Sequence, residues 1–288
     1  MKICRFNSDR YGVLEGDRVL DVTEIFREFS RRKWPALEQG WGDPFIAFLG
    51  QADLGNLLVG ATPVALPDVR LRSPVARPSK VIGAPANYLL HIDESIADAD
   101  IAKSGPIRPI NELGLFLKAS SSLVGVDEGI TTRFPDRRTD HELEFVIVIG
   151  SECANVAEAE ALDYVAGYSL GLDVTLRGSE ERSFRKSIDS YTVLGPCLVT
   201  KDEIPNPDAV HFTLDVNDVR RQDAFTADMI FGCRKLISLA SSFYTLHPGD
   251  LIYTGAPAGV GQIQPGDRLF INCEEIGSAS VSVKGVSQ

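Results

Sequence analysis

The alternation of apolar and polar positions is most informative in the middle of the chain, where it predicts a buried strand. Residues 140–150 begin with acidic and polar side chains, continue as an apolar and largely β-branched run, and close on Gly150. A short apolar run bounded by glycine is typical of a strand in a protein core. Because strand side chains alternate between two faces, Glu142 and Glu144 are expected to point the same way, roughly 7 Å apart.

Other patterned segments divide the chain in two. The first 65 residues predict a small β-rich unit of three strands and a helix, at residues 2–6, 11–14, 18–22 and 22–32. Two prolines among polar residues at 71–80 suit a domain boundary. We therefore expect a small β-rich N-terminal domain at residues 1–72 and a larger domain at residues 73–288.

The larger part is expected to contain both strands and helices. The pattern predicts strands at residues 80–83, 114–118 and 167–175 and amphipathic helices at 154–168 and about 226–244. The strand at 114–118 ends in Lys118, and the strand at 167–175 contains Asp173 near its end. Residues 95–111 are polar and small and include glycine and proline, which suits either a mobile flap or an ordinary loop.

His91 and Glu94 are three positions apart, so they are neighbours if this segment forms a helical turn. A histidine held by a carboxylate is an oriented base. A plain ion pair on a helix surface has the same spacing, and spacing alone favours that simpler interpretation.

Composition and charge narrow the classes of function. The chain has 288 residues, 44% of them hydrophobic, which is enough for a large core. The net charge of −11 argues against nucleic acid or an anionic membrane surface as a partner. The five cysteines are odd in number and far apart, which indicates reduced thiols in a cytoplasmic protein. No apolar run is long enough to cross a bilayer.

Three acidic residues, Glu142, Glu144 and Asp173, are expected at or near the ends of core strands. Carboxylates aimed together repel one another unless a positive charge lies between them. A solvated strand end is the simpler interpretation of the glutamate pair taken alone, and the third acid favours a metal site. Hard oxygen ligands select Mg²⁺, Mn²⁺ or Ca²⁺ over zinc, and no cysteine or histidine spacing competes.

The order of short motifs from about residue 80 to the C-terminus resembles the fumarylacetoacetate hydrolase family. The motifs are Gly83, Asn87, Tyr88, His91, Glu94, residues 116–118, 140–144, Asp173, Arg177, and residues 186–189, 194–196, 216–217, 229–231, 248–250 and 254–257. The resemblance implies an α+β, mostly β fold: a mixed, barrel-like β-roll with flanking helices behind a small N-terminal domain. It also implies a homodimer.

The resemblance further implies roles for individual residues. Glu142, Glu144 and Asp173 would hold Mg²⁺ or Mn²⁺, and His91, Glu94 and Lys186 would be catalytic. The implied substrate contacts are Asn87, Tyr88, Lys118, Arg177, Glu180 and Thr254. The chain departs from the family at Gly178 and Glu180, where the family often has aspartate and glutamine. An acid at 180 would repel an anionic substrate unless it pairs with Arg177 or Arg182.

The function implied is metal-dependent hydrolysis of a C–C bond in a 2,4-dioxo acid of the acylpyruvate or fumarylpyruvate type. The metal would chelate the keto-carboxylate end, His91 would activate water for attack on the 4-carbonyl, and the cation with Lys186 would stabilise the departing enolate. Two alternatives use the same residues. One is an oxaloacetate-type decarboxylase or an oxo-dioate isomerase or hydratase, and the other is a non-catalytic, metal-dependent binder of 2-oxo acids.

Overall fold

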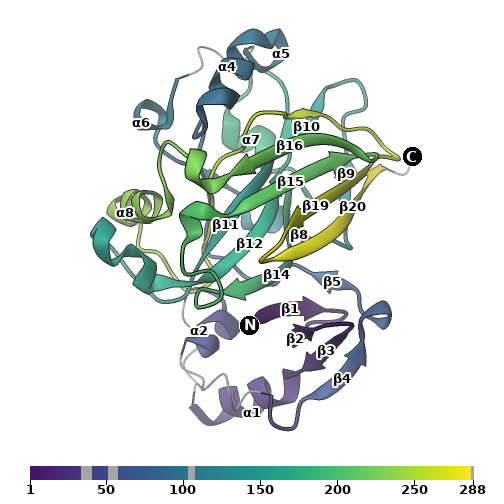
Figure 1. The fold of residues 1–288 in the computed structure, drawn as a ribbon, viewed down its shortest axis with the longest axis vertical. Coiled ribbons are helices and arrows are strands. Elements are labelled where there is room, and N and C mark those ends of the chain that lie inside the picture. The colour runs from purple at the N-terminus through teal and green to yellow at the C-terminus, as the bar shows by residue number, and fades with distance from the viewer. Residues whose placement is uncertain (34–40, 51–57, 103–107, 287–288) are drawn as a thin grey trace.

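The structure is a computed structural model, and it describes residues 1–33, 41–50, 58–102 and 108–286. Residues 103–107, part of the expected flap, lie outside the described residues. The chain forms a strand-rich, mixed α+β fold built on three sheets (Figure 1).

The largest sheet has twelve strands and contains the centre of the molecule. Its order is β4 (Thr62–Ala65), β3 (Arg18–Asp21), β2 (Arg10–Glu15), β1 (Lys2–Phe6), β14 (Thr192–Thr200), β12 (Val165–Asp173), β11 (Leu143–Ile149), β17 (Leu251–Tyr253), β6 (Val81–Gly83) and β7 (Phe116–Lys118). Two further strands join it, β5 (Leu71–Arg72) beside β1 and β8 (Leu123–Gly125) beside β14. The pairing of these described strands ends at β4 and β7, so the sheet is open and not a closed barrel.

Two smaller sheets complete the strand framework. The first has the order β13 (Thr175–Leu176), β10 (Thr139–His141) and β18 (Gly261–Gln262). The second has the order β16 (Val219–Phe225), β15 (His211–Val216), β19 (Arg268–Cys273), β20 (Gly277–Gly285) and β9 (Ile130–Thr132).

Short helices surround the sheets. The described α-helices are α1 (Thr23–Lys33), α2 (Pro44–Leu49), α4 (Leu89–Ala97), α5 (Ala99–Ala102), α6 (Ile110–Leu113), α7 (Arg182–Lys186) and α8 (Cys233–Phe243). Short 3₁₀ segments lie at η2 (Leu66–Asp68), η3 (Ser120–Ser122), η4 (Glu158–Tyr164), η5 (Pro207–Ala209) and η6 (Thr226–Asp228). Helices α4, α5 and α6 lie at the end of the molecule opposite α1 and α2 (Figure 1). No helix in the described ranges combines the length and apolar character needed to cross a membrane.

Two predicted helices are wrong in extent. The helix expected at 154–168 is only the 3₁₀ turn η4, because residues from Val165 onward belong to β12 and pair with β11. The helix expected from about 226 begins at Cys233. The residues before it are extended, since Ile230 N–H donates to the Asn87 carbonyl and Phe231 N–H to the Asn87 side chain.

Strand β11 is the predicted buried strand, and every residue in it is buried. It lies between β12 and β17, so both of its edges are paired. Phe145 and Ile147 pack into one apolar cluster, whereas Val146 and Val148 pack into another. Glu144 lies two positions before Val146 and therefore shares its face of the strand. The acidic end of this strand is thus the continuation of an apolar core face.

The pairing of β11 with β12 continues into the small sheet without a change of register. Leu143 pairs with Leu172 in the large sheet, and Asp140 pairs with Thr175 in the small one. Between them Glu142 and Asp173 lie opposite each other, joined by a backbone hydrogen bond of 2.8 Å from Asp173 N to Glu142 O. Residues opposite each other in an antiparallel pair present their side chains on the same face. The two acids therefore meet where the paired strands pass from one sheet to the other.

The amino-terminal strands are continuous with this framework. Strand β1 pairs antiparallel with β14, with Lys2 opposite Val199. Strand β14 in turn pairs with β12, which carries Asp173. The expected domain division at residues 72 and 73 stays a prediction, and the sheet shows that the two parts share one backbone ladder.

Candidate metal centre and active site

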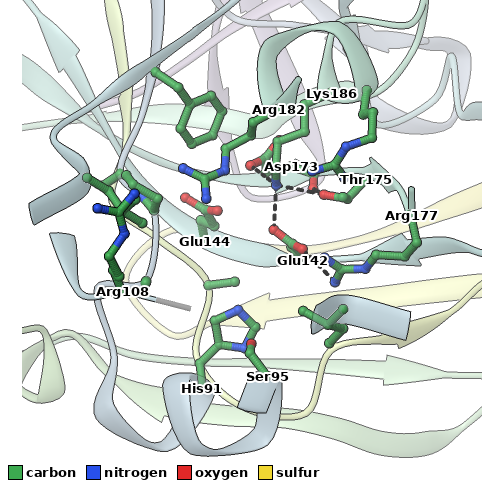
Figure 2. Close-up of a pocket in the computed structure, with 18 residues that line it drawn as sticks. His91, Ser95, Arg108, Glu142, Glu144, Asp173, Thr175, Arg177, Arg182 and Lys186 are labelled. Atoms are coloured by element: carbon green, nitrogen blue, oxygen red, sulfur yellow. Dashed lines mark hydrogen bonds and ion pairs between the residues drawn. The ribbon is translucent and has the colours of Figure 1, made fainter. Parts of the chain in front are cut away.

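A cavity of about 180 Å³ opens beside the ends of β11 and β12. Acidic side chains line one part of it, and His91 and Ser95 of helix α4 approach from another (Figure 2). Helix α7 contributes several basic side chains. The cavity therefore brings together residues from segments that are far apart in the sequence.

Glu142, Glu144 and Asp173 form a buried carboxylate cluster. One oxygen from each residue lies within 4.8 Å of the others. Glu142 and Glu144 share a face through strand alternation, and Asp173 joins them through its cross-strand position. Three hard oxygen donors in this arrangement are the ligand type that Mg²⁺ and Mn²⁺ prefer.

Basic side chains neutralise two of these carboxylates. Lys186 Nζ lies 2.7 Å from Glu142 Oε2 and 2.6 Å from Asp173 Oδ2. Lys118 Nζ also donates to Asp173, and an Arg177 nitrogen lies 2.9 Å from Glu142 Oε1. Although burial raises the pKa of Glu142, the charges of Lys186 and Arg177 outweigh it and hold the pKa below its usual value. Glu142 is therefore ionised.

Glu144 has no such cationic partner. Its Oε2 accepts a 2.6 Å hydrogen bond from Gly255 N–H, and it forms no ion pair with any residue that the structure describes. Burial and the nearby charge of Asp173 raise the pKa of Glu144 well above its usual value. A buried carboxylate of this kind needs a positive charge, and a divalent cation among the three acids would supply it. The donor set and its charge thus fit a hard dication.

His91 and Glu94 form the expected pair on helix α4. His91 Nδ1 lies 3.2 Å from Glu94 Oε2. Glu94 is itself held by Gly259 N–H, at 3.0 Å and 3.1 Å from its two oxygens. Because a carboxylate only accepts hydrogen bonds, this contact places a proton on Nδ1 and leaves Nε2 as an acceptor. The His91 ring faces the cavity across from Glu142 (Figure 2).

Three of the expected substrate contacts point elsewhere than into the cavity. The Asn87 amide donates to the carbonyls of Phe231 and Thr254, at 3.0 Å and 2.7 Å, and accepts from Phe231 N–H at 2.7 Å. The Thr254 hydroxyl donates to Phe145 O at 2.8 Å. Tyr88 is buried, and its hydroxyl has no hydrogen-bond partner among the described residues. In this arrangement Asn87 and Thr254 hold neighbouring loops in place.

Glu180 pairs with neither Arg177 nor Arg182, contrary to the expected compensation. Its oxygens accept from the guanidinium of Arg137 at 2.8 Å and 2.9 Å, on the surface of the molecule. Arg177 is held instead by Asp140, whose Oδ2 lies 2.8 Å from Arg177 Nε. The acid at position 180 is therefore neutralised outside the cavity, and Arg177 is fixed between two carboxylates.

Sequence reasoning missed several residues that line the cavity. They are Ser95, Arg108, Phe116, Thr175, Arg182 and Arg185. Arg185 is structural, since it donates to the carbonyls of Glu180 and Leu176. Arg182 lies on the same short helix as Lys186 and four positions before it. That spacing on one helix face was the available signal.

Comparison with known proteins identifies the family. The sequence profile described as "Fumarylacetoacetate (FAA) hydrolase C-terminal" matches residues 80–284. The chain belongs to the fumarylacetoacetate hydrolase family. This membership confirms the resemblance found in the sequence, and the matched range contains the whole carboxylate cluster and the His91–Glu94 pair.

Individual members of the family match nearly the full chain. A maleylpyruvate hydrolase of Aquipseudomonas alcaligenes is 49% identical over 99% of this chain and 100% of its own. The crystal structure of maleylpyruvate hydrolase from Sphingobium sp. SYK-6, in complex with manganese (II) ion and pyruvate, covers 100% of both chains with a TM-score of 0.82 at 32% identity. A 2-hydroxyhepta-2,4-diene-1,7-dioate isomerase from Mycobacterium marinum covers 100% of both chains, with a TM-score of 0.73 at 26% identity.

Proposed function

We propose that this member of the family is a divalent-metal-dependent hydrolase that cleaves a C–C bond in a 2,4-dioxo acid. The observation that carries the proposal is the cluster of Glu142, Glu144 and Asp173 facing the His91–Glu94 pair across one cavity. The 49% identity to a maleylpyruvate hydrolase over almost the whole chain supports a substrate of the maleylpyruvate type.

The carboxylates of Glu142, Glu144 and Asp173 would hold Mg²⁺ or Mn²⁺. Bound there, such an ion supplies Lewis-acid polarisation of substrate oxygens. The relative whose structure contains manganese and pyruvate supports a 2-oxo acid as a ligand of this protein.

His91 is proposed as the general base. Glu94 accepts from Nδ1, so the Nε2 lone pair can take a proton from water as the water oxygen attacks the 4-carbonyl carbon. The bond between carbons 3 and 4 then breaks, and its electron pair leaves with the 2-oxo acid as an enolate. Return of a proton to carbon 3 gives the 2-oxo acid, and the attacked carbonyl becomes a carboxylic acid. Water is the only co-reactant consumed.

Basic side chains would stabilise the negative charge that develops. Lys186 Nζ lies among the acids and also donates to Thr175 Oγ1 at 2.6 Å, and in this place it would stabilise the enolate oxygen. Lys118 is buried against Asp173, and its Nζ also donates to the carbonyl of Tyr191 at 2.8 Å. An ammonium group held in place this way stabilises developing charge without reorganising.

Two observations favour hydrolysis over decarboxylation or isomerisation. One is the sequence identity to a maleylpyruvate hydrolase. The other is the oriented His91, because a general base is needed when water must be activated. The homodimer implied by the resemblance remains part of the proposal. A cytoplasmic location is also proposed, because all five cysteines are free and buried.

The test is a metal-dependent assay that follows loss of the dioxo-acid enol absorbance. Wild-type protein with Mg²⁺ or Mn²⁺ should hydrolyse maleylpyruvate, and Glu142→Gln and Asp173→Asn should each lose at least about 100-fold of the activity. Glu144→Gln should abolish the rise in melting temperature that metal produces in the wild type.

Glu24→Gln is the matched control, because Glu24 lies on exposed helix α1 and pairs only with Arg27 among the described residues. It should leave both readouts unchanged. Full activity in both Glu142→Gln and Asp173→Asn would refute the site.

A further inference from the structure

We infer that Arg182 is a specificity residue that binds a second carboxylate of the substrate, so that the site prefers dicarboxylic 2,4-dioxo acids over those with an uncharged acyl chain. The inference rests on the proposed function and adds the residue that would recognise the carboxylate of the acyl group. Arg182 lies on helix α7, and its side chain lines the same cavity as Glu144 (Figure 2).

Unlike the basic residues that bond to the carboxylate cluster, Arg182 has no anionic partner among the described residues. Lys186 and Arg177 each contact two acidic oxygens or more, at 2.6–2.9 Å. Lys118 is likewise paired with Asp173. The guanidinium of Arg182, in contrast, forms no hydrogen bond or ion pair with any residue in the described ranges. Its donors are therefore available to a ligand.

The guanidinium is nevertheless held in a defined place. Its central carbon lies over the ring of Phe116, 5.5 Å from the ring centroid. A cation–π contact with an aromatic face helps to position a guanidinium and leaves its edge donors free. Burial lowers the pKa of Arg182 from its usual value, which is the cost of holding a desolvated cation without a partner. A planar guanidinium that is desolvated and unpaired is suited to bidentate contact with a carboxylate.

A second guanidinium lies on the same side of the cavity. Arg108 lines the cavity and is exposed, and it too forms no hydrogen bond or ion pair with a described residue. In Figure 2, Arg108 and Arg182 lie on the side of the cavity away from Arg177. Two positive charges that line one cavity raise its positive potential, which favours a doubly charged anion over a singly charged one.

The keto-carboxylate end of the substrate is assigned to the carboxylate cluster, with the Mg²⁺ or Mn²⁺ that the cluster would hold. A monocarboxylic substrate bound there leaves the guanidinium of Arg182 unpaired, and a dicarboxylic substrate satisfies it. A site that contains a buried polar group rejects ligands that cannot pair with it. We therefore expect the site to distinguish substrates by the presence of a carboxylate at the acyl end.

The experiment compares two substrates on the full-length protein with Mn²⁺ bound. Arg182→Gln should lower kcat/KM for maleylpyruvate by about 10- to 100-fold, mostly through KM, because a charge-assisted contact to the bound acid is lost. The same variant should change kcat/KM for acetylpyruvate, whose acyl chain is uncharged, by less than about twofold. Arg182→Lys should restore part of the loss, since it keeps the charge without the fork.

Arg133→Gln is the control variant, because Arg133 is exposed and paired with Asp189, and it should leave both substrates unaffected. Equal losses on the two substrates in Arg182→Gln would assign Arg182 to the keto-carboxylate end and overturn the inference, as would no loss on either. Hydrolysis of neither acid by the wild type would overturn the proposed function instead. In that case calorimetry tests whether Arg182 binds a second carboxylate. Arg182→Gln must weaken binding of oxaloacetate and leave binding of pyruvate unchanged.

Discussion

At the scale of single residues, the carboxylate cluster follows from two simple geometric rules. Glu142 and Glu144 share a face because they are two positions apart on extended backbone, and Asp173 joins that face because it lies opposite Glu142. The first rule can be read from the sequence, and the second needs the register of two strands thirty residues apart. The acids were predicted because each lies near the end of a recognisable strand.

The partners of the basic residues could not be predicted in the same way. Glu180 was expected among the substrate contacts, where it would repel an anion unless paired with a nearby arginine, and it pairs with Arg137 on the surface. Arg108 and Arg182 were not expected in the cavity at all. These placements depend on how separate loops fold over the strand ends, and spacing along the chain does not encode that.

The His91–Glu94 pair gives a prediction at this scale. Glu94→Gln should lower kcat by about 10- to 100-fold with little change in KM, because the amide can no longer stabilise a protonated His91. His91→Ala should lower kcat by about 100- to 10,000-fold. Steady-state kinetics with Mn²⁺ and maleylpyruvate provide the measurement.

Asp93→Asn serves as the control for the dyad variants, since this neighbouring acid is not among the residues that line the cavity. Unchanged kcat in His91→Ala would exclude His91 as the base.

At the scale of elements, strands were predicted better than helices. The strands at 2–6, 18–22 and 140–150 have clear apolar patterns and appear within a few residues of the expected limits. The alanine-rich segment at 154–168 has a helical pattern, but its end is taken by β12. Pairing of β12 with β11 between Val165 and Leu172 outweighs a local helical preference.

Asn87 connects elements whose proximity cannot be predicted from secondary-structure propensity. Its side chain makes three hydrogen bonds, to Phe231 O, Phe231 N and Thr254 O. These join the turn before α4, the segment before α8 and the end of β17. A single buried amide thereby fixes the loops that surround the cavity.

Asn87→Ala should lower the free energy of unfolding by about 2–4 kcal/mol, because it leaves buried backbone groups without partners. Urea denaturation measures the change. Asn272→Ala removes an exposed side chain of β19 and should cost less than about 0.5 kcal/mol. Equal effects in the two variants would contradict the connecting role of Asn87.

At the scale of the whole molecule, the fold class and family were predictable because many short motifs occur in one order. The relation between the two predicted domains was not, since it depends on the pairing of β1 with β14. The apolar cluster that contains Ile3, Phe45 and Phe48 also contains Val146, Val148 and Leu198. The amino-terminal part thus covers core residues of the larger part.

A fragment of residues 73–288 should accordingly be less stable than the full chain. Its loss of the β1 partner leaves the edge of β14 unpaired, and its loss of α2 uncovers apolar surface. We expect aggregation, or a melting temperature lower by roughly 10 °C or more, since each lost kcal/mol shifts it by about 2–4 °C. Differential scanning fluorimetry at matched concentration is the measurement. A soluble fragment with an unchanged melting temperature would show that residues 73–288 form an independent domain.

The junction of β1 with β14 also sets an order of events during synthesis. Met1 and Thr200, which contact each other at this junction, are 199 positions apart. A ribosome releases the first of these strands long before the second exists, so the early strand must persist without its neighbour while most of the polypeptide is still being made. Nascent chains of this enzyme are therefore exposed to unwanted strand pairing throughout that interval, and chaperone demand should be greatest before residue 200 has emerged.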